Sequence, residues 1–306
     1  MGLRRCFLAL GLVVAGAGGS AIPAGAAVAP VDPFATGAMR SFLHSRAGDV
    51  TAAVENLWTG RTYLYRPGVA EHTASIVKVD ILETLLHELH GSPLPPGVAG
   101  TAQGMIEFSD NNDATALWNR EGGAPAVAAY DRLIGMSQTR PNGAWGLTST
   151  TALDQIKLLR QLVDPRPPGF LTPGGRAYEL GLMGSVTPSQ RWGVSGGVPG
   201  GVGIALKNGW LPEHGGWQIN SIGHIDGGER DYLIAVLTSG NPSEGYGIGT
   251  IQGIAAITFA ELAEQEAGMW GYGVEAGGWG PTSETAAAGR AAAREGERRL
   301  ADRASG

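Results

Sequence analysis

One stretch of the chain, from Ser75 to His90, contains neither glycine nor proline and constrains the fold more than any other. Apolar residues recur along it at helical spacing, and others add apolar surface between them: Ile76, Val77, Val79, Ile81, Leu82, Leu85, Leu86 and Leu89. A helix that is apolar on most sides is a buried one. We therefore expect this segment to form a helix at the centre of the molecule.

Strand patterns lie on both sides of this helix in the sequence. Val50–Trp58 and Arg61–Tyr65, separated by Thr59-Gly60, predict a β-hairpin. After Gly193, further strands are predicted at Val202–Lys207, Trp217–His224 and Tyr232–Thr238, followed by a helix over Ile248–Glu264. Shorter helices are expected between these groups, at Ala102–Phe108, Ala114–Trp118, Pro125–Ile134, Thr151–Leu162 and Gly175–Met183. This order predicts an α+β fold, an antiparallel sheet with a helical insertion.

The composition is that of a folded, soluble protein. The chain has 306 residues, of which 43% are hydrophobic and 16% charged, so it can bury a sizeable core. Its net charge of −6 argues against nucleic acid and anionic membranes as partners.

The N-terminus has the three parts of a secretory signal peptide. Arg4 and Arg5 precede the apolar run Phe7–Ala15, and small residues follow through Ala26. The apolar run is shorter than the roughly 20 residues of a spanning helix, so we expect cleavage near Ala26 and no stable membrane insertion afterwards. The protein would be secreted, extracellular or in the cell envelope, and free of cysteine because Cys6 is removed.

The remaining domain boundaries follow from composition. Residues 1–26 are the predicted signal peptide, and residues 32–267 are predicted to form one catalytic domain with a helical subdomain at about 75–195. Residues 268–306 have few aliphatic side chains and are expected to be a disordered tail.

The start of the central helix carries a pair of residues suited to nucleophilic catalysis. Ser75 and Lys78 are three residues apart and so lie on one helix face. A serine hydroxyl needs a base to take its proton, and a desolvated lysine can be that base. Lysine is scarce in this chain, and burying one in so apolar a helix is costly, which makes its placement informative.

Two further polar clusters follow at a distance. Ser109-Asp110-Asn111 precedes a helix, where such residues also act as ordinary N-caps. Lys207-Asn208-Gly209 ends the apolar run Val202–Leu206, where a lysine can simply protect an edge strand.

Taken together and in this order, the three clusters resemble the S-x-x-K, S-D-N and K-T-G elements of class A β-lactamases and their penicillin-binding relatives. The resemblance covers about residues 40–265. It implies a five-stranded antiparallel sheet flanked by helices with an all-helical subdomain, and a site between the two parts.

The resemblance also implies residue roles. Ser75 attacks, Lys78 takes part in proton transfer, and Ser109 relays a proton to the leaving group. Asn111, Lys207, Asn208, Gly209 and Trp210 would bind substrate, with the N–H groups of Ser75 and Trp210 forming an oxyanion hole. No metal or cofactor is expected, and we expect a monomer.

The chain departs from the family pattern in two places. Asn208 stands where the family has a hydroxyl residue, and Trp210 is bulky for the strand that lines the oxyanion hole. The segment Gly135–Leu147 contains no carboxylate, although class A enzymes hold a glutamate there to activate the deacylating water; Trp145 falls near that position.

These departures leave several functions open. The leading hypothesis is a secreted serine hydrolase that forms an acyl-enzyme on Ser75 with β-lactams or related amides. The alternatives are a D,D-peptidase-like or esterase activity in the cell envelope, and a catalytically idle protein that binds penicillins or cell-wall peptides. His214 and His224, near the site strand, are further acid or base candidates.

Overall fold

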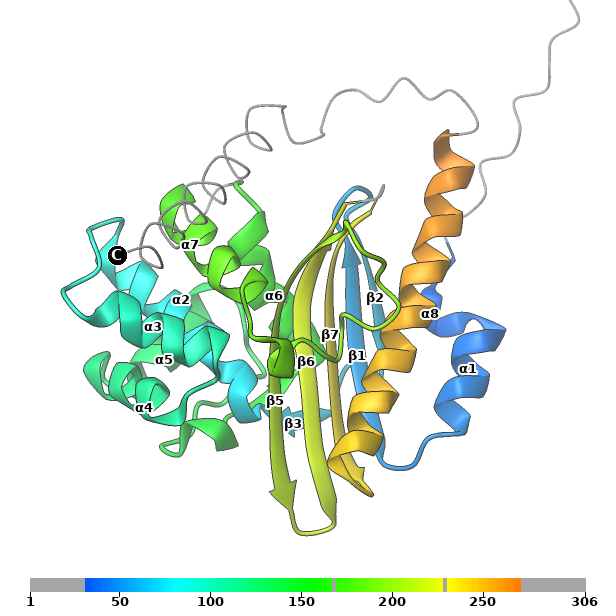
Figure 1. Ribbon diagram of the computed structural model, residues 1–306, viewed down its shortest axis with the longest axis horizontal. Helices are drawn as coiled ribbons and strands as arrows, with labels where there is room; N and C mark the ends of the chain where they lie inside the picture. Colours follow the sequence, from blue (N-terminus) through cyan, green and yellow to red (C-terminus); the bar gives the residue numbers. More distant parts are fainter. Residues whose placement is uncertain (1–30, 167–168, 228–229, 271–306) are drawn as a thin grey trace, which may run out of the picture.

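The computed structural model describes residues 31–166, 169–227 and 230–270. The predicted signal peptide and nearly all of the predicted tail lie outside these residues. Within them, a five-stranded sheet separates two groups of helices, as Figure 1 shows. The expected α+β architecture with a five-stranded antiparallel sheet is confirmed.

The sheet combines the beginning and the end of the chain. Its order is β2-β1-β7-β6-β5, all antiparallel. The early hairpin is β1 (Asp49–Asn56) and β2 (Arg61–Tyr65); the late strands are β5 (Gly203–Glu213), β6 (Gly216–Asp226) and β7 (Asp231–Asn241). Because β1 pairs with β7, β5 is left at the edge, where the helical insertion meets it.

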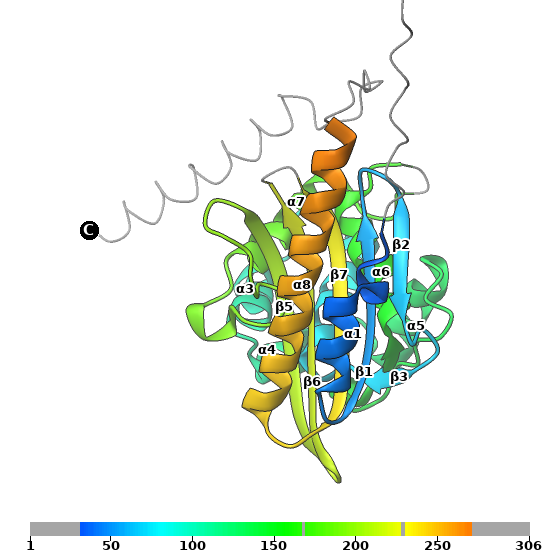
Figure 2. The same ribbon diagram turned by 90° about the vertical axis from the view of Figure 1, so that its right-hand side faces the viewer.

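Two helices cover one face of the sheet, as Figure 2 shows. They are α1 (Gly37–His44), which the sequence analysis missed, and α8 (Glu244–Trp270), which continues three residues past the predicted domain boundary at 267. A small helical turn, η1 (Pro33–Ala35), also packs there.

The opposite side carries the helical insertion. It contains α2 (Val77–Leu89), α3 (Val98–Glu107), α4 (Asn111–Arg120), α5 (Ala124–Leu133), α6 (Ala152–Val163) and α7 (Pro173–Gly184). Short 3-10 turns lie at η2 (Ala74–Ile76), η3 (Trp145–Leu147) and η4 (Pro188–Gln190). A two-stranded sheet, also missed, pairs β3 (Ala70–His72), just before α2, with β4 (Ser149–Thr151), just before α6.

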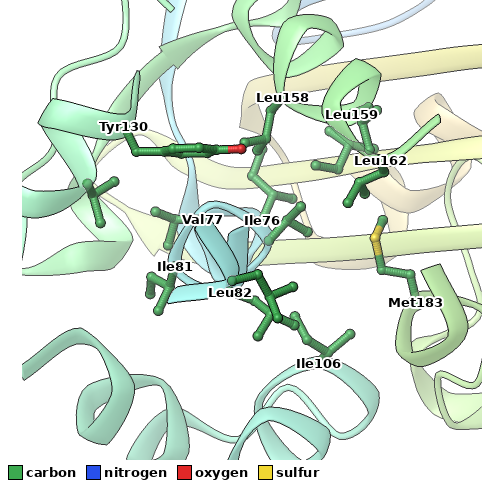
Figure 3. Close-up of a cluster of buried hydrophobic side chains, with 14 of the residues drawn as sticks. Ile76, Val77, Ile81, Leu82, Ile106, Tyr130, Leu158, Leu159, Leu162 and Met183 are labelled. Carbon is green, nitrogen blue, oxygen red and sulfur yellow. The ribbon is translucent and has the colours of Figure 1, made fainter. Parts of the chain in front are cut away.

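The predicted central helix is confirmed as the hub of the helical insertion. Side chains of α2 and its preceding turn are enclosed by α3, α5, α6 and α7 (Figure 3). They pack with residues labelled there, including Ile106, Tyr130, Leu158, Leu159, Leu162 and Met183. This burial fixes the position of the turn that carries Ser75.

The interior around α2 is more polar than the sequence pattern indicated. It buries a group of carboxylic acids, each at most 8% exposed: Asp80, Glu83, Glu121, Asp131 and Glu179. Tyr130 donates a 2.7 Å hydrogen bond to Glu83, but none of the ion pairs in the described residues involves this group. Burial raises the pKa of each of these carboxyls, which favours their neutral forms.

Candidate active site

Ser75 lies at the only break in a long buried segment. Between Thr73 and Leu86 it is the one residue that is not buried. Instead of starting a regular helix, as the sequence analysis expected, it belongs to the 3-10 turn η2, and α2 begins at Val77. Ala74 has a φ of 48°, which is strained for a residue with a side chain. The chain is thus bent so that Ser75 reaches the surface.

Asn220 on β6 holds the segment that leads into this turn. Its amide nitrogen donates to the carbonyl oxygens of His72, at 2.7 Å, and Thr73, at 3.0 Å. The side chain is fully buried, and its oxygen accepts a hydrogen bond from the Thr238 N–H. Asn220 is not among the site residues predicted from the sequence, in which the only indication of its role is an amide between apolar residues of a predicted strand.

Gly209 brings the edge strand β5 against Ser75. A Cβ at residue 209 would lie 2.6 Å from the Ser75 nitrogen and 2.8 Å from the Thr73 oxygen. Real Cβ atoms do not approach so closely, so only glycine fits without a shift of the backbone. The close contact places the predicted oxyanion strand beside the predicted nucleophile.

Lys78 is fully buried and holds the second predicted motif in place. Its Nζ donates to the Ser109 carbonyl oxygen at 2.6 Å and to Asn111 Oδ1 at 2.8 Å, and it lies 3.1 Å from Ser109 Oγ. The two carbonyl-type oxygens can only accept, so they take two of the lysine's hydrogens. When Lys78 is neutral, its lone pair therefore remains for a hydroxyl group.

Lys207 approaches the same hydroxyl from the sheet. Its Nζ lies 2.9 Å from Ser109 Oγ and donates to the Asn208 carbonyl at 3.0 Å, with the side chain 1% exposed. Lys207 was predicted to lie at the end of a strand, but β5 continues to Glu213. Its position in the middle of the strand keeps it rigid and buried.

The two lysines share one desolvated environment, which weakens their hold on protons. Burial lowers the pKa of Lys78 to about 7, although Asp110 and Asp113 oppose this shift. Burial, with the neighbouring charge of Lys78, also lowers the pKa of Lys207. Lys78 can therefore exchange a proton near neutral pH.

Ser109 reaches the lysines through a strained backbone. Its φ is 58°, in the left-handed region, directly before Asp110 caps α4 by accepting from the N–H groups of Asn112 and Asp113. The N-cap interpretation is thus confirmed for Asp110, while Ser109 and Asn111 bond to Lys78. Of the non-glycine residues with positive φ in the described chain, Ala74 and Ser109 lie in this site.

Trp145 covers the Lys78 ammonium group. The lysine Nζ is 5.1 Å from the centre of the Trp145 ring, and the indole N–H donates to Thr115 at 3.2 Å. The residue lies in the carboxylate-free segment, at the turn η3. An aromatic face thus stands over the lysine.

The side chains of Asn208 and Trp210 point to the other face of β5. Asn208 is 1% exposed and donates to the carbonyls of Gln190 and Trp192, while the rings of Trp210 and Trp192 are 5.8 Å apart. The structure therefore does not bring the Asn208 side chain to the cluster, although the family resemblance placed Asn208 among the substrate-binding residues. The bulk of Trp210 is likewise directed away, so that only its backbone borders the site.

The candidate histidines are not part of this cluster. His224 pairs with Asp231 at 2.7 Å across β6 and β7, and His214 lies in the turn between β5 and β6. Among the described residues, no group of three or more histidine, cysteine, aspartate or glutamate side chains is arranged to hold a metal ion.

These features together define a class of protein. A half-exposed serine at the start of a buried helix, a lysine one turn later, and a second serine shared by two buried lysines are set against the edge strand of a five-stranded sheet. This arrangement is similar to that of the serine β-lactamase superfamily.

Comparison with known proteins agrees with this likeness to β-lactamases. Residues 96–262 match the sequence profile described as "Beta-lactamase enzyme family", and the chain belongs to that family. Similar solved structures include the class A β-lactamase from Mycobacterium abscessus, with 21% identity, a TM-score of 0.63, and coverage of 73% of this chain and 97% of that one. The TLA-1 extended-spectrum β-lactamase has 17% identity and a TM-score of 0.66, over 73% of this chain and 96% of that one.

The curated relatives match a smaller part of this chain than the solved structures do. A protein named "Putative lipoprotein LppW", from Mycobacterium bovis and Mycobacterium tuberculosis, is 30% identical over 175 residues, which are 54% of this chain and 54% of that protein. The chain thus spans about half the length of the curated relatives it matches. In the described part of the chain, no helix is both long enough and apolar enough to span a membrane.

Proposed function

We propose that this protein is a serine hydrolase that forms an acyl-enzyme on Ser75 with β-lactams or related cyclic or peptidic amides. The observation that carries the proposal is the convergence of Lys78 and Lys207 on one hydroxyl, that of Ser109, at 3.1 Å and 2.9 Å. Burying two amines beside each other is unfavourable, and proton transfer gives a reason for it.

The acylation step that we propose uses Lys78 as the base. Neutral Lys78 takes the proton of Ser75 Oγ, which bonds to the substrate carbonyl carbon while negative charge develops on the carbonyl oxygen. The N–H groups of Ser75 and Trp210 are the proposed oxyanion donors, because Gly209 sets their two segments in contact.

Cleavage of the substrate carbon–nitrogen bond requires a proton for the leaving nitrogen. As the carbon–nitrogen bond breaks, the leaving nitrogen takes the Ser109 proton, and Ser109 takes the one held by Lys78. Lys207 stabilises negative charge on Ser109 and on the substrate. Asn111 presents its free amide side to a substrate amide, since its oxygen is bonded to Lys78.

Trp145 favours a long-lived acyl-enzyme. Hydrolysis of the ester needs a base that activates water, and the segment over Lys78 offers an indole in place of a carboxylate. We therefore favour penicillin-binding or D,D-peptidase-like behaviour, or an esterase acting on activated substrates, over rapid lactam turnover. A catalytically idle binding protein is the other alternative, and it predicts no covalent adduct.

The decisive experiment is exposure of the purified protein to a fluorescent penicillin followed by intact-mass measurement. We expect one adduct per chain, absent in Ser75→Ala and retained in Ser195→Ala. An unmodified wild-type protein with bound, exchangeable penicillin would show an idle binder and overturn the proposal.

We also propose export to the cell envelope. The support is the charged, apolar and small-residue order of residues 1–26, together with the lipoprotein name of the curated relatives. N-terminal sequencing and mass analysis of the protein from its host should give a chain starting near residue 27. A lipid-modified chain starting at Cys6, or an uncleaved one, would contradict cleavage near Ala26.

A further inference from the structure

A second polar site lies at the far end of the edge strand. A partly open cavity of about 290 Å³ lies between β3, the turn joining β5 and β6, and the end of β7. We call it the β3 pocket; Glu71, His72, Glu213, His214, Gln218 and Ser239 are among its lining residues. In Figure 1 β3 is seen behind β5 and β6, and it contacts β7. None of the lining residues belongs to the Ser75 site.

Glu71 is the most buried carboxylate in this pocket. Its side chain is held by Ser239, whose hydroxyl donates at 2.9 Å, and by Gln218, whose amide lies at 3.4 Å. The residue is 9% exposed and takes part in no ion pair within the described chain. The nearby Arg66 is paired with Asp49 at 2.6 Å. A carboxylate has thus been oriented by neutral donors and left without a counter-ion.

A second carboxylate faces the same space. Glu213 is 2.6 Å from His72 Nδ1, so its other oxygen is available, and its side chain is 30% exposed. Even a protonated His72 would balance only Glu213. His214 also lines the pocket, and when both histidines are neutral the pocket carries an excess of negative charge, so that a positive ligand would offset the cost of burying Glu71.

The size and donors of the pocket select the kind of cation. In the described residues, no group of three or more histidine, cysteine, aspartate or glutamate side chains is arranged to hold a metal ion, and the volume approaches the roughly 300 Å³ of small ligand sites. A guanidinium binds best along the common edge of both carboxylate oxygens, but each Glu71 oxygen already accepts from a different neighbour. An ammonium is a compact charge with three rotatable donors and does not need that edge.

We propose that the β3 pocket binds a primary ammonium group, either of a small amine or at the end of a longer molecule, between Glu71 and Glu213. The site is separate from the proposed acyl-transfer chemistry, and its occupation does not require Ser75. The two sites are close in the sequence: Glu71 and His72 come just before the turn that carries Ser75 and that Asn220 holds in place.

Titration calorimetry of the mature protein with butylammonium chloride tests the proposal. We expect saturable binding that weakens with added salt, and that 1-butanol does not reproduce. Glu71→Gln and Glu213→Gln should each weaken binding by about fivefold or more, which corresponds to about 1 kcal/mol for one charge contact. Glu261→Gln, the same charge change on α8, should leave it unchanged.

Several outcomes would overturn the assignment. They are absence of binding up to tens of millimolar amine, equal binding by the Glu71→Gln/Glu213→Gln double variant, or tighter binding of methylguanidinium than of butylammonium. If Glu71→Gln does not fold, the binding measured for Glu213→Gln and the salt dependence of binding to the wild type still test the proposal. Penicillin labelling of Ser75 is measured in parallel, so that failure of the acyl-enzyme proposal is seen separately from failure of amine binding.

Discussion

Gly209 lies so close to Ser75 that a Cβ on residue 209 would come within 2.6 Å of the serine nitrogen. Gly209→Ala should push β5 away from the turn and widen the oxyanion hole. We expect the acylation rate to fall by about 10²-fold, comparable to loss of one oxyanion donor. Stopped-flow measurement with a fluorescent penicillin gives the rate. Gly181→Ala, at a helical glycine with open space around its Cβ position, is the matched control; equal rates in both variants would refute the role of this contact.

The pKa of Lys78 near 7 predicts the pH dependence of acylation. Below this pH the lysine is an ammonium without a lone pair, so the rate should rise about tenfold per pH unit and level off above pH about 7. Lys78→Arg should abolish acylation at every pH because its guanidinium stays protonated. Lys157→Arg on α6 serves as the control. A rate that is flat on both sides of pH 7 would exclude Lys78 as the base.

Acylation and deacylation should differ widely in rate. With Trp145 over Lys78 and no carboxylate in the segment Gly135–Leu147, penicillin assays should show a burst of about one equivalent and then a slow steady state, since a general base typically contributes roughly 10²–10⁴-fold. Quenched-flow and mass measurements follow both steps. Rapid turnover without a burst would mean that another group activates water, and Lys78 itself and His214 would then be tested by mutation.

The buried carboxyls of the helical insertion predict that stability falls as pH rises. Glu121 has a pKa of about 9 in the folded protein, because of burial, against an ordinary value of 4.5. Between these values the folded state binds more protons than the unfolded state, so each raised group lowers the free energy of unfolding by up to about 1.4 kcal/mol per pH unit.

Glu121→Gln should therefore have little effect near pH 4 and should stabilise the protein increasingly above pH 5. Thermal unfolding followed by circular dichroism at several pH values measures this difference. The control variant Glu261→Gln should not change how the unfolding temperature depends on pH. If Glu121→Gln shifted the unfolding temperature by the same amount at acidic and alkaline pH, Glu121 would not titrate in this way.

Asn220 is predicted to position the nucleophile without touching substrate. Asn220→Leu removes both hydrogen bonds to the carbonyls of His72 and Thr73, and we expect slower acylation together with lower stability. The two effects are separated by saturating the enzyme: a positioning role lowers the maximal acylation rate, while penicillin binding before acylation stays close to wild type. A variant that loses stability but keeps its maximal rate would reduce Asn220 to a structural role.

Much of the fold could be predicted because it follows local patterns. The leucine spacing of the central helix and the alternation in the strands are properties of neighbouring residues. The residues of the site could be named because Ser75, Lys78, Ser109 and Lys207 resemble a family pattern, and the structure brings the two lysines to Ser109 within hydrogen-bonding distance.

What was missed depends on contacts between distant segments. The short strands β3 and β4 pair Ala70 with Thr151, and no local pattern marks such a brief ladder. The direction of the Asn208 side chain is set by carbonyls of Gln190 and Trp192. The carboxyls around α2 come from several helices, and the sequence pattern of one helix does not show that they share an interior.

The pairing of β1 with β7 has a consequence for the order in which the protein folds. Asp49 meets Ser239 across this ladder, so the first strand made must wait for nearly the whole chain before it finds its neighbour. The helical insertion can collect around α2 earlier, but Ser75 then has no Gly209 beside it. Closing so long a loop is slow compared with forming helices. Catalytic competence should therefore be the last property acquired during folding, and a chain truncated before β5 should contain Ser75, Lys78 and Ser109 and yet show no acylation.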